Sequence, residues 1–165
     1  MSTPAPTFTE STPWPVGPTP AQWQGVTALP ELGLIDAQGA DTASFLHGQL
    51  SQDIQLLPAG EARLAAYCTA KGRMLADFTV WRHGDDGVRL LVSAALLPAT
   101  LKRLSMFVLR AKVRLSDALA GTAPVRLHGV VGLPLLNELA AQASAAVPEP
   151  MQVLALPDGA ELIRL

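Results

Sequence analysis

Short apolar runs separated by polar turns fill the first half of the chain and predict an ordered unit of strands and helices. Residues 32–36 (LGLID) form one such run, which predicts a strand. Asp41 then offers an N-cap carboxylate to a helix predicted over residues 42–50. The buried stripe of that helix is expected to be Phe45, Leu46 and Leu50.

Residues 65–78 (AAYCTAKGRMLADF) hold two alternating runs and predict a β-hairpin. If Lys71 and Gly72 form a two-residue loop, facing residues sum to 143, and Tyr67 faces Ala76. Lys-Gly is a weak turn signal, so a longer loop stays open, as does a one-residue slip that exchanges the faces. The expected core face is Ala65, Tyr67, Met74, Ala76, Phe78 and Val80. The opposite, mixed face is Leu64, Cys68, Leu75, Asp77 and Thr79.

The next runs complete this unit. Residues 83–87 (HGDDG) predict a turn into a strand over residues 88–93. Pro98 suits the first turn of a helix, and residues 112–117 (KVRLSD) alternate as a strand does. The helix stripe is expected to be Leu97, Leu101, Leu104 and Val108. The order β-α-β-β-β-α-β predicts an α+β fold, an antiparallel sheet with two packed helices.

A second α+β pattern follows Gly121. It predicts strands over residues 125–131, 151–156 and 161–165, with a helix over residues 134–146. Because the sequence stops within an apolar run, we expect a fragment of a longer protein.

The N-terminal segment differs in composition from the rest. Residues 1–25 contain six prolines among Ser, Thr and Ala, which predicts a flexible arm. The expected organisation is therefore the arm, a first domain over residues 26–120, and the beginning of a second domain over residues 121–165.

Composition narrows the class of protein. The 165 residues are 49% hydrophobic with a mean hydropathy of +0.28, which predicts a packed chain rather than a disordered one. A single cysteine, the lack of a signal peptide and the lack of an apolar run of ~20 residues predict a cytoplasmic protein without a membrane partner.

The net charge of −2 argues against a dedicated nucleic-acid binder, but the charge is unevenly spread. Residues 63–114 hold ten Lys and Arg against three Asp, a net charge of +7. This segment could attract an anionic ligand, or its cations could simply solvate strand and helix edges.

Several kinds of site have no support in the sequence. His47, His83 and His128 lack metal-ligand spacing, and we find neither a nucleophile–base pattern nor a phosphate-binding glycine motif. Cys68 is interpreted as a small buried hydrophobe. No catalytic residue and no metal ligand is predicted.

Three stretches, in order, resemble the folate-binding YgfZ proteins, which are relatives of the aminomethyltransferase (T-protein) of the glycine cleavage system. The first is GADTASFLHGQLSQDI with Gly48, Gln49, Ser51 and Asp53. The second is the run Cys68, Ala70, Lys71, Gly72, Arg73 and Met74. The third is LKRLSMFVLRAKVRL, beginning at Leu101.

This resemblance implies a three-domain, ring-like architecture that binds tetrahydrofolate in a central opening. It also implies a role in the maturation or repair of iron–sulfur enzymes and in the tRNA modification that depends on them. Some relatives carry a folate-stacking tryptophan where this sequence has Leu32. The diagnostic Lys-Gly-Cys-x-x-Gly-Gln-Glu motif of the family's second half is absent from this sequence.

The candidate folate contacts each have a structural alternative. Asp77 could accept hydrogen bonds from a pteridine, or serve as an ion-paired strand acid. Lys71 and Arg73 could hold the anionic glutamyl tail, or form a solvated hairpin tip. Gln49 and Asp53 follow a helix, where they could equally satisfy loop amides. The complete candidate set is Leu32, Gln49, Asp53, Tyr67, Lys71, Arg73 and Asp77.

Three functions are compatible with these features. The favoured one is a non-catalytic folate-binding accessory protein of the YgfZ type, with folate as ligand and iron–sulfur enzymes as candidate partners. The alternatives are a folate-dependent aminomethyltransferase and an RNA-binding module that uses the cationic segment. Direct contact with tRNA is not expected, because few aromatic side chains are available for stacking.

Overall fold

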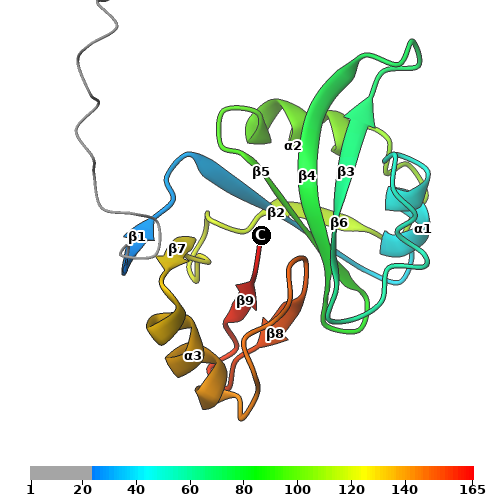
Figure 1. Cartoon of the computed structure of the whole chain (residues 1–165). Helices are drawn as coiled ribbons and strands as arrows, with labels where there is room; N and C mark the ends of the chain where they lie inside the picture. The colour runs from blue at the N-terminus through cyan, green and yellow to red at the C-terminus, as the bar shows by residue number, and fades with distance from the viewer. Residues whose placement is uncertain (1–23) are drawn as a thin grey trace, which may run out of the picture.

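A five-stranded antiparallel sheet, in the order β3-β4-β5-β2-β6, forms the centre of the computed structural model, which describes residues 24–165 (Figure 1). Its strands are β2 (Leu32–Gln38), β3 (Ala62–Cys68), β4 (Met74–His83), β5 (Gly87–Ser93) and β6 (Arg114–Asp117). Its helices are α1 (Thr42–His47) and α2 (Leu97–Ser105). The predicted order β-α-β-β-β-α-β and the α+β class are confirmed.

The second α+β pattern, which follows Gly121, also forms strands and a helix. It comprises β7 (His128–Val131), α3 (Leu133–Gln142), β8 (Val153–Ala155) and β9 (Glu161–Ile163). An unpredicted strand, β1 (Gly25–Ala28), pairs with β7 in a separate two-stranded sheet. Apart from its last two residues, the arm predicted over residues 1–25 lies outside the described residues. The predicted domain boundaries stay predictions.

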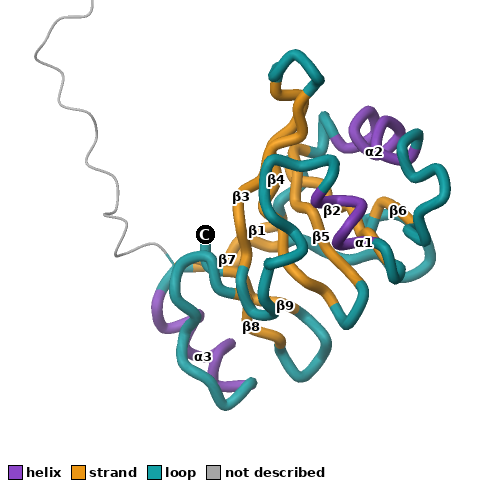
Figure 2. Tube along the Cα trace, turned by 90° about the vertical axis from the view of Figure 1, so that its right-hand side faces the viewer, coloured by secondary structure: helices purple, strands orange, loops and turns teal. Residues whose placement is uncertain are grey.

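Both helices pack on one face of the five-stranded sheet, as Figure 2 shows. The core between them contains apolar side chains from β3, β4, β5 and β2, among them Tyr67, Phe78 and Leu90. Phe45, Leu46 and Leu50 are buried there as predicted, although α1 ends at His47 rather than at residue 50. The Arg82 guanidinium donates to the carbonyl oxygens of Ile54 and Leu57, so it also fixes the loop before β3.

The register of the β3–β4 hairpin follows the predicted sum of 143 from Ala62–Trp81 to Tyr67–Ala76. The longer loop that the weak Lys-Gly signal left open is the one observed, because a bulge at Tyr67/Cys68 pairs Cys68 with Met74 and leaves five residues in the loop. Met74, predicted to be in the core, is 60% exposed. Its side chain is not buried because this end of the hairpin projects beyond the helices that cover the rest of the sheet (Figures 1 and 2).

Asp41 precedes α1 as predicted, but its side chain does not cap the helix. Its Oδ2 instead accepts a hydrogen bond of 2.8 Å from the backbone N of Lys112. The carboxylate therefore joins α1 to the segment before β6. Among residues 24–165, no helix is long and apolar enough to cross a membrane.

The other face of the sheet is covered over only part of its area, by the β8–β9 hairpin and the segment after β6. A second apolar cluster forms here around Leu34, Ala62 and Trp81. Backbone hydrogen bonds from Ala62 N to Met151 O and from Val153 N to Gly60 O join the hairpin to the beginning of β3. This half of the second face is therefore closed by the C-terminal hairpin.

Glu161 joins that hairpin to the sheet through three side chains. Trp81 Nε1 donates to its Oε2 at 3.0 Å, Arg89 Nη1 donates to the same oxygen at 2.6 Å, and His83 Nδ1 lies 3.0 Å from Oε1. The Glu161 and Arg89 side chains are only 14% and 13% exposed. Burial alone would raise the pKa of Glu161, but the hydrogen bonds from His83 and Trp81 and the charge of Arg89 hold it below its ordinary value.

We expect Glu161→Ala to lower the free energy of unfolding by about 3 kcal/mol, because it removes the carboxylate bonded to the nearly buried Arg89 and leaves only Asp36, 3.9 Å away, beside that charge. Urea unfolding measures this loss. Glu149→Ala is the control, since Glu149 is 77% exposed and only 4.0 Å from its partner Arg164. Equal effects of the two substitutions would contradict the assignment.

The same carboxylate predicts a dependence on pH. Because the pKa of Glu161 is lowered in the folded chain, its stabilising contribution is complete above the ordinary glutamate value of about 4.3 and is lost as pH falls through the lowered pKa. The difference in unfolding free energy between the wild-type chain and Glu161→Gln should therefore shrink on acidification. A difference that stays constant from pH 7 to pH 3 would show that Glu161 does not titrate in this way.

Candidate functional site

The part of the second sheet face that the β8–β9 hairpin leaves uncovered is the candidate site. We call it the open face, and it comprises Leu32, Leu64, Ala66, Asp77, Thr79 and Ser93. Leu64 is 70% exposed, although it is an apolar residue in the middle of a strand. An apolar strand surface without a cover is typical of a binding surface.

Two cross-strand pairs lie on the open face beyond the region in which β4 and β5 pair with each other. Ala66 pairs with Asp77, and Ser93 pairs with Leu32. Asp77 and Ser93 each lie two residues beyond Thr79–Leu91, the last pair between β4 and β5, and so point to the same side. We call the two pairs Ala66–Asp77 and Ser93–Leu32 the open-face row; between them, β4 and β5 have already ceased to pair.

Asp77 is the only carboxylate in this row. Its side chain is exposed, and among residues 24–165 it has no ion pair and no hydrogen bond. Within the described residues, Asp77 is therefore not an ion-paired strand acid, which was the structural alternative. The carboxylate oxygens are free to accept hydrogen bonds from a ligand.

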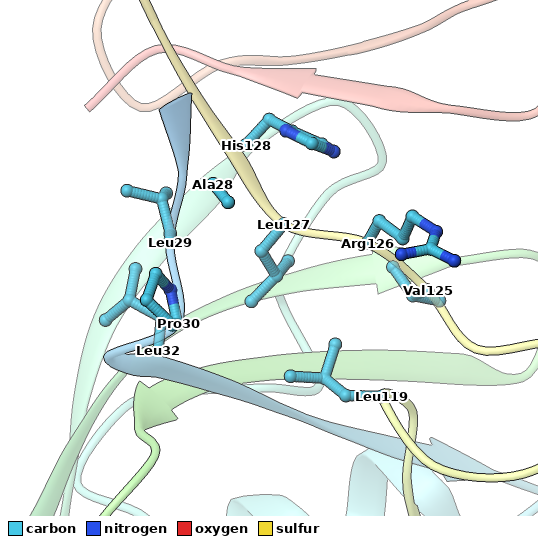
Figure 3. Close-up of a pocket in the computed structure, with 9 residues that line it drawn as sticks. All are labelled: Ala28, Leu29, Pro30, Leu32, Leu119, Val125, Arg126, Leu127 and His128. Atoms are coloured by element: carbon cyan, nitrogen blue, oxygen red, sulfur yellow. The ribbon is translucent and has the colours of Figure 1, made fainter. Parts of the chain in front are cut away.

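Leu32 also borders a groove of about 230 Å³ that opens beside the row (Figure 3). The groove lies between the β1–β2 connection and the segment before β7. Its walls are joined by a hydrogen bond of 3.1 Å from Leu29 N to Leu127 O and by the β1–β7 pairing. The complete lining is Ala28, Leu29, Pro30, Leu32, Leu119, Val125, Arg126, Leu127 and His128.

Lys71 and Arg73 lie in the projecting hairpin loop, away from the groove. Thr69 organises this loop, since its carbonyl accepts from Gly72 N at 2.8 Å and its Oγ1 accepts from Arg73 N at 3.1 Å. Gly72 has φ +77°, a left-handed conformation that favours glycine. Both cations are exposed and, in the described part of the chain, form no ion pair.

Gln49 and Asp53 lie outside the open face, in the segment that follows α1. Ser51 in this segment exchanges hydrogen bonds with the backbone of Ala66, so the segment is attached to the edge strand β3. The hydrogen bond from Leu56 N lowers the pKa of Asp53, and His47 Nδ1 lies 3.2 Å from its Oδ1. These contacts give the segment a structural role.

Two further residues complete the comparison with the sequence-based candidates. Tyr67 is 4% exposed and lies in the core under α1, on the face opposite to Asp77. Cys68 is exposed, so its interpretation as a buried hydrophobe is wrong. The bulge places it at the end of the hairpin, beyond the packed part of the sheet.

Sequence reasoning missed Ser93, Arg126 and His128. The run Val125-Arg126-Leu127-His128 alternates apolar and basic residues, which could have indicated two basic side chains on one side of an extended segment. Its partner wall is distant in sequence and could not be identified from that pattern. No cluster of residues suited to a metal ion occurs within residues 24–165.

Comparison with known proteins gives a matching family model and several relatives. The family model of the GCVT N-terminal domain matches residues 23–152. A "tRNA-modifying protein YgfZ" of Vibrio vulnificus is 32% identical over 124 residues, covering 73% of this chain and 38% of that protein. An uncharacterised protein of Haemophilus influenzae is 35% identical over 86 residues, covering 52% of this chain and 31% of that protein.

Among solved structures, the glycine cleavage system aminomethyltransferase T from Bartonella henselae is similar. It has a TM-score of 0.65 and 19% identity, over 81% of this chain and 36% of that one. This likeness shows the fold. The chain spans about a third of the length of the curated relatives it matches.

We expect Asp53→Ala to lower the urea midpoint of unfolding without changing the affinity for folate, because its carboxylate accepts from the loop amide of Leu56 and faces His47. Asp85→Ala, in the exposed β4–β5 turn, is the control and should leave the midpoint unchanged. Unchanged unfolding together with a collapse of folate affinity would show instead that Asp53 contacts the ligand.

Proposed function

Because the chain belongs to the family of the GCVT N-terminal domain, we propose that it forms part of a folate-binding accessory protein of the YgfZ type. The observation that carries this proposal is the unpaired carboxylate of Asp77 on an open sheet face beside an apolar groove. The relatives named YgfZ support it, since two of them are 32% and 30% identical to this chain over 73% and 64% of its length.

The chemistry of a reduced pterin suits Asp77. The amide N–H and amino group at the edge of a pterin are adjacent donors, and a carboxylate can accept from both. Ser93 and Thr79 add hydroxyl groups at neighbouring positions of the same face. A ligand that lies flat on the row would also cover Leu64, which water otherwise surrounds.

The biological setting is part of the same proposal. Relatives with the name "tRNA-modifying protein" support an accessory role in tRNA modification, for which iron–sulfur enzymes are the partners we infer. A cytoplasmic location is supported by the exposed thiol of Cys68, which a reducing compartment keeps free.

The test is the titration of 5-formyltetrahydrofolate into the chain, followed by amide chemical shifts. We expect shifts at Asp77, Thr79, Ser93 and Leu32. We expect Asp77→Asn to weaken binding about tenfold, or ~1.4 kcal/mol, because the amide replaces one acceptor oxygen with an NH2 donor that faces a donor of the pterin. Asp86→Asn, in the exposed β4–β5 turn, keeps the same charge change and should not alter affinity.

Other outcomes decide against the proposal. Shifts confined to residues outside the open face, or equal affinities of Asp77→Asn and Asp86→Asn, would contradict it. Transfer of a one-carbon unit from an aminomethyl donor to tetrahydrofolate would favour the aminomethyltransferase alternative. Steeply salt-dependent binding of tRNA in the absence of folate would favour the RNA-binding alternative.

A further inference from the structure

The segment that joins α2 to β6 exposes three large apolar side chains that the proposed folate contacts do not use. Leu109 is 88% exposed, and Met106 and Phe107 are 58% and 45% exposed. The three residues lie within four consecutive positions, in the loop that runs along the outer side of the molecule between α2 and β6 (Figure 2). Apolar side chains that are gathered in this way form a patch, and such a patch is typical of a contact surface.

The direction of these side chains follows from the residues that pack beneath them. Val108 and Ala111 contact the core between the helices and the sheet. Leu109 and Arg110 lie between these two residues and are exposed, so they face away from the core. Lys112, directly after Ala111, is exposed as well. Apolar and basic side chains therefore share the outer side of this loop.

The last turn of α2 continues the same surface. Met106 follows the helix with helical dihedral angles, so Lys102, Arg103 and Met106 lie within ~100° of one another around its axis. Leu97 and Leu104 are buried on the other side. Cations stabilise the C-terminal end of a helix, which accounts for Lys102 and Arg103 but not for the exposed apolar residues beside them.

The cations of this region lack acidic neighbours in the sequence. Residues 87–116 contain six Lys and Arg and no Asp or Glu. Among residues 24–165, only Arg89 of these six forms an ion pair. The carboxylate of Asp41 reaches the segment, but it accepts from the backbone N of Lys112. The surface is therefore cationic as well as apolar, and it fits an anionic partner.

The exposed apolar residues distinguish between the possible anionic partners. RNA offers phosphates to the cations, but its backbone has no apolar interior that would cover Leu109. A protein would need an apolar recess that matches a protruding loop. A bilayer of anionic lipids needs no matching shape, because its phosphate head groups lie directly above the acyl chains that accept apolar side chains.

We propose that residues 102–112 form a peripheral contact with an anionic lipid bilayer. Met106, Phe107 and Leu109 enter the boundary between head groups and acyl chains, and the cations Lys102, Arg103, Arg110 and Lys112 lie at the phosphates. The sequence-based expectation of no membrane partner depended on the lack of a spanning apolar run, which a peripheral contact does not require. The cytoplasmic leaflet carries anionic lipids, so the contact is compatible with a cytoplasmic location.

This inference goes beyond the proposed function and does not depend on it. The helices lie on the sheet face opposite to Asp77, so none of the residues in the contact belongs to the open face. Failure of folate binding and failure of lipid binding are therefore separate results.

The experiment is cosedimentation of the 165-residue chain with lipid vesicles at low salt. Vesicles of equal parts phosphatidylglycerol and phosphatidylcholine present an anionic surface, and vesicles of phosphatidylcholine alone present a neutral one. The variants are Leu109→Asn and Arg110→Gln. Asparagine is chosen because Leu109 has φ +31°, in the left-handed region that asparagine adopts more readily than leucine.

Each variant has a matched control elsewhere on the molecule. Leu56→Asn makes the same replacement at a leucine that is 74% exposed, before β3 at the opposite edge of the sheet from β6. Arg126→Gln makes the same change of charge at an exposed arginine, between Val125 and Leu127, which pack over the other sheet face.

We expect the wild-type chain to bind the anionic vesicles and not the neutral ones, with binding that weakens as salt is added. Leu109→Asn should weaken binding about tenfold, because one apolar side chain no longer enters the bilayer. Arg110→Gln should weaken it about fivefold, or ~1 kcal/mol, for one cation at an anionic surface. Both controls should bind like wild type. Unchanged urea midpoints of both variants would separate lost contacts from lost structure.

Four results would overturn the inference. The first is absence of wild-type binding to the anionic vesicles, and the second is equal binding by wild type, Leu109→Asn and Arg110→Gln. The third is binding of tRNA that Arg110→Gln weakens and Leu109→Asn does not, which would identify an RNA contact instead. The fourth is a concentration-dependent dimer that Leu109→Asn dissociates, which would identify a second copy of the chain as the partner.

Discussion

The hydrogen-bonded ion pair between Glu161 and Arg89 is the interaction on which the division of the sheet into a covered and an open half depends. The carboxylate accepts from Arg89 and Trp81, and His83 lies beside its other oxygen. Three donors on two strands thus converge on one residue of the C-terminal hairpin. A carboxylate so nearly buried would cost free energy without these partners, which makes the docked position of the hairpin specific.

The docked position of the β8–β9 hairpin determines which part of the second sheet face is covered and which part stays exposed as the candidate site. The hairpin closes the second apolar cluster around Leu34, Ala62 and Trp81, whereas Leu64 stays exposed on β3. Leu119 and Val125 belong to this cluster and also line the groove beside Leu32. The wall of the groove is consequently built on the same packing that Glu161 secures. Stability of the C-terminal hairpin and shape of the proposed ligand site are therefore linked.

The sequence predicted those features that depend on local pattern. Alternation in β3 and β4 gave the faces and the sum of 143, since side chains alternate with a period of two along any strand. It could not give the bulge at Tyr67/Cys68 or the exposure of Met74, because both depend on where the packed helices end. The candidate folate contacts taken from the resemblance lie on both faces of the sheet. Asp77 is on the open face, whereas Tyr67 is in the core.

Contacts between segments that are far apart in the sequence could not be predicted from local sequence patterns. Trp81 and Glu161 are 80 residues apart, and nothing in either local pattern indicates the other. The groove likewise joins the β1–β2 connection to residues 125–128, and β1 itself was not predicted because prolines dominate the preceding segment. Long-range packing, rather than local propensity, places Arg126 and His128 beside Leu32.

The central claim is that folate binds on the open face with its pterin at Asp77. Nuclear Overhauser effects between bound 5-formyltetrahydrofolate and the isotope-labelled chain test this most directly. The account predicts contacts from the pterin methylene protons to the methyl groups of Thr79 and Leu64. Contacts from the pterin methylene protons only to residues outside the open face would contradict it.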